Sequence, residues 1–141
     1  MVKFEKIGYV ANNCESHADC LELRDMESEL IIFEKYLDGL KDIENCEFLQ
    51  VLFKFHLCRN DYDLIDQSYN GRPTGIFASR SNGRPNNIGL TTVQQIGRYG
   101  NRIKVVGLDA LNRSPILDIK PYNPILDKKW SPQQSYVSNS F

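Results

Sequence analysis

No stretch of this 141-residue sequence approaches the run of about 18 apolar residues that a transmembrane helix needs. The first six residues also lack an apolar signal core behind them, which argues against export. We therefore expect a cytoplasmic protein that does not span a membrane. No internal repeat, linker or low-complexity tract divides the chain, and its length is typical of one domain.

The sequence also lacks the paired C-x-x-C spacing of common zinc sites, although it has four cysteines, at positions 14, 20, 46 and 58. Without an export signal we expect these thiols to be reduced. The spacing Cys14-x-x-His17-x-x-Cys20 places three soft ligands in seven residues. A structural zinc ion usually takes four ligands, and the fourth would have to come from far along the chain. We expect a loop with two thiols and no metal; a metal site is the alternative.

The net charge of −1 hides a separation of charge along the chain. Residues 1–67 carry 7 lysines and arginines against 15 acids, whereas residues 68–130 carry 10 against 3. A positive face can attract an anionic partner even when the whole molecule is nearly neutral. The alternative is that the two halves pair with each other across the fold. Charge alone leaves both interpretations open.

Branched, aromatic and alternating runs predict short strands over 4–10, 28–33, 48–57, 75–78, 88–96, 102–108 and 116–119. Residues 34–40 have a short helical pattern, and residues 11–27 and 59–74 are polar loops. Tyr99-Gly100-Asn101 is a plausible hairpin turn. Pro121 and Pro124 are expected to exclude regular structure beyond the last strand. The pattern predicts a mainly β, single-domain antiparallel sheet or barrel with one or two short helices.

The arginine-containing run from Gly75 to Gly89 has no regular period over its second half and cannot be a core element. Arg80 and Arg84 flank a Ser-Asn-Gly turn, and arginine presents a planar fork of donors suited to carboxylate or phosphate. Glycines at 83 and 89 allow close approach of the backbone. The run therefore indicates a site for a nucleotide-like ligand. The alternative is a structural loop whose arginines pair with the acidic N-terminal half.

A second cluster spans residues 108–122, where Asp118 stands between apolar neighbours in a predicted strand. A buried carboxylate without a partner would be costly, so a partner such as Lys120, Arg84 or a backbone turn is expected. We favour a structural role in which Asp118 pins the arginine loop over a direct part in catalysis.

Several motifs together resemble one family. They are Phe4 to Gly8, Gly39 to Glu44, Val51 to His56, Gly75 to Ser81, Arg84-Pro85-Asn86, Ile88-Gly89-Leu90 and Asp118 to Tyr122. In these runs the chain resembles the TsaA/YaeB family, the TrmO family of tRNA methyltransferases that use S-adenosylmethionine. The resemblance covers about residues 4–127 of a single domain over 1–141, and leaves 128–141 as a C-terminal tail.

The resemblance implies an S-adenosylmethionine-binding antiparallel β-barrel that is generally a homodimer. It implies methylation of the exocyclic nitrogen of threonylcarbamoyladenosine, next to the anticodon of certain tRNAs. By motif match, the cofactor contacts fall on His56, Arg80, Leu90, Asp109, Ala110 and Leu111. Arg84, Arg113 and Lys120 are candidates for the tRNA backbone or the threonyl carboxylate, which would make binding sensitive to salt. No residue is assigned as a catalytic base.

The chain departs from the family pattern at four places. Asn112 stands where Asp is usual, Leu57 where Gln is common, and Asn87 where a second proline is usual. We expect Asn87 to loosen that end of the loop. The Pro-Arg-Gln segment that helps to close the cofactor site in many members is absent from residues 12–25. Two alternatives follow: a methyltransferase for another RNA or small molecule, and an S-adenosylmethionine-binding module without turnover.

Overall fold

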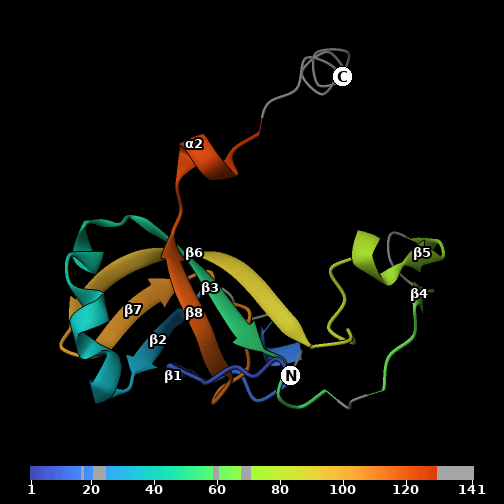
Figure 1. Ribbon diagram of the computed structural model, residues 1–141, viewed down its shortest axis with the longest axis horizontal. Helices are drawn as coiled ribbons and strands as arrows, with labels where there is room; N and C mark the ends of the chain where they lie inside the picture. Colours follow the sequence, from blue (N-terminus) through green and yellow to red (C-terminus); the bar gives the residue numbers. More distant parts are fainter. Residues whose placement is uncertain (17, 21–24, 59–60, 68–70, 130–141) are drawn as a thin grey trace.

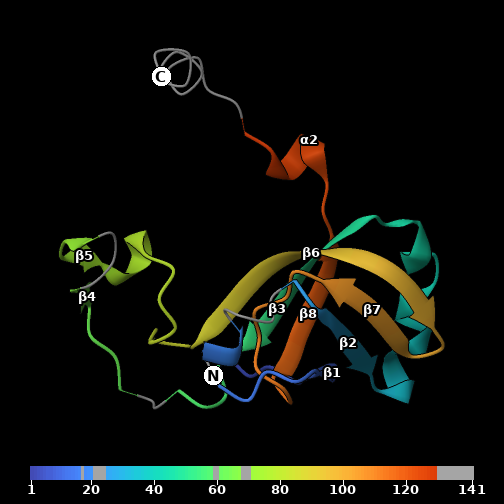
Figure 2. The same ribbon diagram turned by 180° about the vertical axis from the view of Figure 1, so that it is seen from behind.

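Six antiparallel strands close into a barrel in this computed structural model, which describes residues 1–16, 18–20, 25–58, 61–67 and 71–129. The strand order around the barrel is β1-β2-β7-β6-β3-β8. The strands are β1 (Gly8–Ala11), β2 (Glu27–Ile32), β3 (Phe48–Lys54), β6 (Ile88–Tyr99), β7 (Arg102–Val106) and β8 (Pro115–Pro121). Figures 1 and 2 show β3, β6 and β8 from one side and β2 and β7 from the other. The predicted mainly β fold is confirmed.

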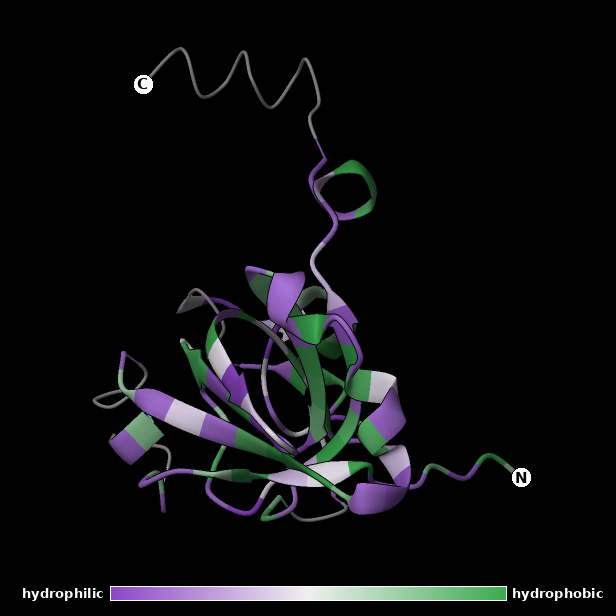
Figure 3. Cartoon of the chain, turned by 90° about the vertical axis from the view of Figure 1, so that its left-hand side faces the viewer, coloured by the Kyte–Doolittle hydropathy of each residue, from purple (hydrophilic) through white to green (hydrophobic). Residues whose placement is uncertain are grey.

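The barrel interior is filled by alternate residues of each strand, because successive side chains of a strand point to opposite faces. In β3 these are Leu49, Val51 and Phe53, and in β7 they are Ile103 and Val105, all nearly inaccessible to solvent. Figure 3 shows apolar and polar residues alternating along the strands. Burying each such side chain contributes about 1.5–3 kcal/mol, so this core is the main source of stability.

Strand β6 is the longest strand and pairs with two others, β3 and β7. Its first half pairs with β3, with Gly89 opposite Phe53 and Leu90 opposite Leu52. Its second half pairs with β7, and the register shifts between Gln95 and Gly97. Bulges of this kind bend a strand and increase its twist. The turn to β7 contains Gly100 in the left-handed region (φ 64°), which confirms the predicted hairpin.

Outside the barrel, the described part of the chain forms several short helices and a small two-stranded sheet. The predicted helical pattern over 34–40 is confirmed as the 3₁₀ helix η1 (Glu34–Leu40), and η2 (Ile43–Asn45) follows it. The small sheet consists of β4 (Ile65–Asp66) and β5 (Thr74–Gly75), followed by η4 (Ile76–Ala78). In Figures 1 and 2 this arm projects from the barrel, and the chain returns from it to the start of β6.

Three predictions about the elements were wrong. The first strand begins at Gly8 rather than at residue 4, and the run 75–78 is mainly the helix η4 rather than a strand. A short helix, α2 (Pro124–Asp127), follows β8 despite its proline. Proline is tolerated at the first helical position, where its missing N–H would have no partner in the helix. The side chain of Asn123 caps this helix by accepting from Ile125 N at 2.9 Å.

Three sequence-based expectations fall partly on residues that the structure does not describe. These are residues 17 and 21–24 of the predicted loop 11–27, residues 59–60 and 68–70 of the predicted loop 59–74, and residues 130–141 of the predicted tail. Across the part of the chain that is described, no helix is long and apolar enough to cross a membrane.

Among the glycines, Gly8 leaves the least room for a side chain; it pairs with Ile32 of β2 and with Ile116 of β8. A Cβ atom at Gly8 would overlap the carbonyl oxygen of Ile31, and that backbone atom cannot rotate away. We expect Gly8→Ala to lower the free energy of unfolding by about 1–3 kcal/mol, as overpacking of a core does. Gly39→Ala is the control, because nothing lies within 4 Å of its added Cβ. Equal unfolding midpoints for the two variants in urea would contradict this account of the barrel seam.

Candidate functional site

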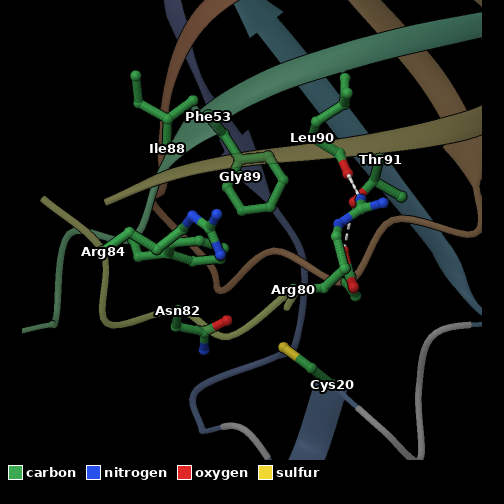
Figure 4. Close-up of a pocket in the computed structure, with 11 residues that line it drawn as sticks. Cys20, Phe53, Arg80, Asn82, Arg84, Ile88, Gly89, Leu90 and Thr91 are labelled. Atoms are coloured by element: carbon green, nitrogen blue, oxygen red, sulfur yellow. Dashed lines mark hydrogen bonds between the residues drawn. The ribbon is translucent and has the colours of Figure 1, made fainter. Parts of the chain in front are cut away.

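A cavity of about 540 Å³ opens where β3 ends and β6 begins. Three groups of residues line it: the end of β3, the start of β6 with the loop before it, and two residues from elsewhere in the chain. The lining residues are Phe53, Phe55, Arg80, Asn82, Arg84, Ile88, Gly89, Leu90, Thr91, Cys20 and Asp109. Figure 4 shows Arg80, Arg84 and Asn82 facing the aromatic ring of Phe53 across the cavity. This volume lies in the usual range for small-molecule sites.

The apolar wall of the cavity is an aromatic pair. The rings of Phe53 and Phe55 meet edge to face, with centroids 5.2 Å apart. A Cβ atom at Gly89 would lie 2.6 Å from Phe53 Cζ and 2.8 Å from Phe55 Cζ, closer than real side chains come. Only glycine at this position lets both rings rest against β6. The result is an apolar wall made by the face of one ring and the edge of the other, against which a heterocycle can pack.

Arg80 is held across the mouth of the cavity by the strand beside it. Its Nη2 atom donates to the carbonyl oxygen of Leu90 at 2.7 Å, the bond drawn in Figure 4. None of the ion pairs in the described part of the chain involves Arg80. The guanidinium is therefore fixed in place without being neutralised, which suits it to binding a carboxylate or phosphate.

Arg84 braces the loop from inside. Its Nη1 atom donates to the carbonyl oxygens of Ser79 at 2.9 Å and of Ser81 at 3.1 Å. The side chain of Ser81 in turn donates to Asp66 on the arm. Among the described residues, the two loop arginines thus bond to backbone carbonyls and not to acids of the N-terminal half. For them, the alternative of pairing between the two halves was wrong.

Asn87 does not loosen the loop, contrary to expectation. It is buried, and its φ of 50° lies in the left-handed region, which the ring of a proline cannot adopt. Asparagine tolerates this conformation better than most residues. Its side-chain Nδ2 donates to the carbonyl oxygen of Asn82 at 3.0 Å, which closes the loop on itself. At this position the loop end is thus held by a side-chain hydrogen bond in a conformation that proline could not adopt.

The segment after β7 contributes the acidic side of the cavity. The exposed side chain of Asp109 lines it, and its Oδ1 atom accepts from Thr91 Oγ1 at 2.6 Å. Ala110 is buried, and its carbonyl oxygen accepts from Asn12 Nδ2 at 2.9 Å. Leu111 lines an adjoining hollow of about 80 Å³ that shares Asp109 with the larger cavity. The structure brings this segment to the same site as Arg80 and Leu90.

His56 lies just beyond β3 but is not part of the wall of the larger cavity. Its Nδ1 atom is buried and has no hydrogen-bond partner among the described residues. Burial, and after it the positive charge of Arg113, lower the pKa of His56. Its imidazole is therefore neutral at physiological pH.

Cys20 was not among the residues predicted for the site, yet it lines the cavity. Burial, and after it the hydrogen bond with Cys14, raise the pKa of Cys20 to about 12. The side chain is therefore a neutral thiol at physiological pH, whereas a metal ligand would have to be a thiolate. His17, the third member of the cysteine motif, lies outside the described residues.

The three predicted RNA-binding residues lie apart from one another. Arg84 is in the cavity wall, and Arg113 pairs with Glu15 at 3.1 Å. Lys120 pairs with Asp118 at 3.2 Å on β8, opposite Gln50 of β3, and does not line the cavity. Asp118 therefore has the partner predicted from the sequence but does not pin the arginine loop, so that expectation was wrong.

Charge pairing between the two halves of the chain is confirmed for three other arginines. Arg98 pairs with Glu44, Arg102 with Glu29 and Arg113 with Glu15, at 3.4, 3.0 and 3.1 Å. These pairs lie on the surface and contribute little stability each. They do neutralise part of the positive second half, so the residual positive charge near the cavity comes from Arg80 and Arg84.

Sequence reasoning missed Phe53, Phe55, Thr91 and Cys20 as site residues. A signal existed for Phe53 and Phe55, because the alternation of β3, continued one residue past its end, places both on one face. Gly89, at the end of the arginine run, is a second signal because a glycine leaves room for large side chains. Thr91 directly follows the predicted Leu90. For Cys20 no local signal existed, because its place in the wall depends on contacts between segments about 90 residues apart in sequence.

Comparisons with known proteins agree on one family. The model of the tRNA-methyltransferase O N-terminal domain matches residues 17–128. An Archaeoglobus fulgidus "Probable S-adenosyl-L-methionine-binding protein" is 44% identical over 99 residues, which are 70% of this chain and 27% of the relative. A mouse "tRNA (adenine(37)-N6)-methyltransferase" is 33% identical over 131 residues, 89% of this chain and 28% of the relative.

The solved structures lead to the same family. A "Crystal structure of TrmO" superimposes with a TM-score of 0.76 at 26% identity, covering 92% of this chain and 61% of that one. The chain thus spans less than two thirds of that structure, and 27% and 56% of the A. fulgidus protein and a Pyrococcus abyssi relative. The family model nevertheless covers most of the sequence and includes the whole cavity wall. The chain belongs to the tRNA-methyltransferase O N-terminal domain family.

Proposed function

We propose that this chain binds S-adenosylmethionine in the 540 Å³ cavity and transfers its methyl group to tRNA. The acceptor is the exocyclic amine of threonylcarbamoyladenosine next to the anticodon. The observation that carries the proposal is the cavity itself: an aromatic wall, a fixed arginine that no acid neutralises, and an acidic segment lie together at one end of a barrel of this family. Relatives named as S-adenosylmethionine-binding proteins support the choice of cofactor.

The residues present suit the chemistry of this cofactor. The surface of Phe53 and Phe55 beside Gly89 accommodates a flat base, since a larger residue at 89 would displace the rings. Arg80 offers guanidinium donors to a carboxylate, and Asp109 offers a carboxylate oxygen to ribose hydroxyls. His56, just beyond β3, is retained as a proposed cofactor contact although it lies outside the wall of this cavity.

The cofactor supplies a methyl group already activated on a sulfonium, so the protein mainly has to align donor and acceptor. Arg80 and Arg84 are both held by carbonyl oxygens, which keeps the cavity wall rigid before the ligand arrives. The neutral thiol of Cys20 adds no charge to the cavity. The accepting amine carries an acyl group and is a weak nucleophile, so loss of its proton at or before transfer assists the reaction.

An anionic acceptor is supported by the charge of the cavity wall. Arg84 lies in the wall and can contact the anticodon loop or the threonyl carboxylate, whereas Arg113, which pairs with Glu15, is retained as a proposed contact outside the cavity. The target base has to be unstacked to reach the cavity. Lys120, which lies away from the cavity, is retained only as a contact to more distant phosphates.

We also infer that two chains associate, and that the protein acts in the cytoplasm, where its tRNA substrate is found. The projecting arm supports the association, because Leu64, Ile65 and Phe77 are exposed on it. Large apolar residues gathered on a protruding element are typical of interaction surfaces.

Binding without turnover is the second candidate. It is favoured by relatives from A. fulgidus and Methanothermobacter thermautotrophicus that are named for S-adenosylmethionine binding alone. Methyl transfer to another RNA or to a small molecule is a variant of the first proposal with the same cofactor site.

Cofactor binding depends most on Arg80. We expect Arg80→Ala to raise the dissociation constant for S-adenosylmethionine about tenfold or more in calorimetric titration, because a charged hydrogen bond contributes about 1.5–3 kcal/mol. Arg72→Ala removes an exposed arginine of the arm and serves as the matched control, with no change expected. A titration of wild-type protein without heat, or equal affinities for Arg80→Ala and wild type, would sink the cofactor assignment.

Turnover is tested with labelled S-adenosylmethionine and bulk tRNA, prepared with and without the threonylcarbamoyl group. We expect methyl transfer to the modified tRNA alone, because only that group supplies the acylated amine and the carboxylate. Transfer to both preparations would redirect the proposal to another nucleotide. Binding of the cofactor without any transfer would favour the binding module.

A further inference from the structure

Two segments at the cavity, far apart in sequence, are joined by the side chain of Asn12, just after β1. Its Nδ2 atom donates to the carbonyl oxygen of Ala110 at 2.9 Å and to Ser28 Oγ at 3.1 Å. Its Oδ1 atom accepts from Cys14 N at 2.9 Å. One amide group therefore orients both the loop after β1 and the segment that follows β7.

A second set of bonds joins the same two segments nearer the surface. Asn112 N donates to the carbonyl oxygen of Cys14 at 2.7 Å, and Asn112 Oδ1 accepts from Asn12 N at 3.0 Å. The Nδ2 atom of Asn112 donates to Glu15 Oε1 at 3.0 Å, while Glu15 Oε2 accepts from Arg113 at 3.1 Å. Both oxygens of this carboxylate are thus taken up by adjacent residues of one segment.

Each of the joined segments ends in the cavity wall. On one side Asp109 directly precedes Ala110, whose carbonyl Asn12 holds. On the other, Cys20 N donates to the carbonyl oxygen of Ser16 at 3.1 Å, which ties Cys20 to the loop next to Glu15. A shift of either segment relative to the other would therefore move Asp109 or Cys20.

We propose that Asn12, Glu15 and Asn112 form a clip that positions the Asp109 and Cys20 sides of the cofactor cavity, with Asn112 as its determining residue. None of the three lines the cavity, so they are positioning residues and not catalytic ones. The inference rests on the proposed binding of S-adenosylmethionine in that cavity.

The chemistry of Asn112 explains why an amide is needed there. The side chain accepts on Oδ1 and donates from Nδ2 at the same time. An aspartate would still accept from Asn12 N, but its second oxygen would face Glu15 Oε1 across a hydrogen-bond distance. Two carboxylates at that separation repel each other. In this chain, therefore, the asparagine at 112 and the glutamate at 15 are chemically matched.

The test is a substitution and its rescue. We expect Asn112→Asp to weaken S-adenosylmethionine binding about fivefold to tenfold, and to raise KM for the cofactor while kcat stays within about twofold. Adding Glu15→Gln places an amide donor opposite the new carboxylate, so the double variant regains an affinity within about twofold of wild type. Asn101→Asp is the matched control: it also loses an amide donor, to the carbonyl oxygen of Ile32, but away from the cavity.

Two results would overturn the clip: unchanged affinity in Asn112→Asp, or a loss that Glu15→Gln fails to restore in a protein with wild-type circular dichroism. If Asn112→Asp does not fold, Glu15→Ala at the surface replaces it and must weaken binding relative to Asn101→Asp. The wild-type titration reports separately on the proposed function. If wild type binds no cofactor, hydrogen exchange still tests whether the clip holds the two segments together. The backbone amides of Cys14 and Asn112 must exchange faster in Asn112→Asp, and their exchange rates must return to those of wild type in the double variant.

Discussion

The site depends on the close approach of two aromatic rings to the backbone of one strand. Gly89 lies opposite Phe53 in the β3–β6 pairing, and the missing side chain leaves room for the rings of Phe53 and Phe55. This contact fixes where β6 begins, and with it the direction in which the preceding loop leaves the barrel. It also places the carbonyl oxygen of Leu90 where Arg80 can reach it. A larger residue at 89 would disturb the wall, the loop and the arginine together.

Around that contact, the cavity is built from polar groups that are already committed to one another. Arg84 braces its loop through two carbonyl oxygens, and Asn87 closes it in a conformation that proline cannot adopt. Thr91 holds the carboxylate of Asp109. Such preorganisation lowers the entropy lost on ligand binding. The wall of the proposed cofactor site is therefore held in place as a whole, and Arg80 is one part of it.

Much of the barrel could be predicted from the sequence, because strands such as β2 and β3 carry branched and alternating side chains over their whole length. The arginine loop was also predictable, since it has no period and cannot be core. Predictions failed where contacts between distant segments decide. Asp118 was expected to pin the arginine loop but forms an ion pair only with Lys120 of its own strand among the described residues, and Cys20 reaches the cavity through Asn12 and Asn112, about 100 residues apart. The helix after β8 was missed because proline was taken as a helix breaker, whereas here it is the first helical residue.

The central claim, that the cavity between Phe53 and Arg80 is the cofactor site, is tested most directly by backbone amide NMR of the protein during titration with S-adenosylmethionine. The account predicts that the largest amide shifts fall on Leu90, Thr91 and Ala110 at the cavity. The amide signals of Leu40 in η1 and of Ile119 in β8 should stay unchanged. Shifts centred on Leu40 and Ile119, or no shifts at saturating cofactor, would contradict it.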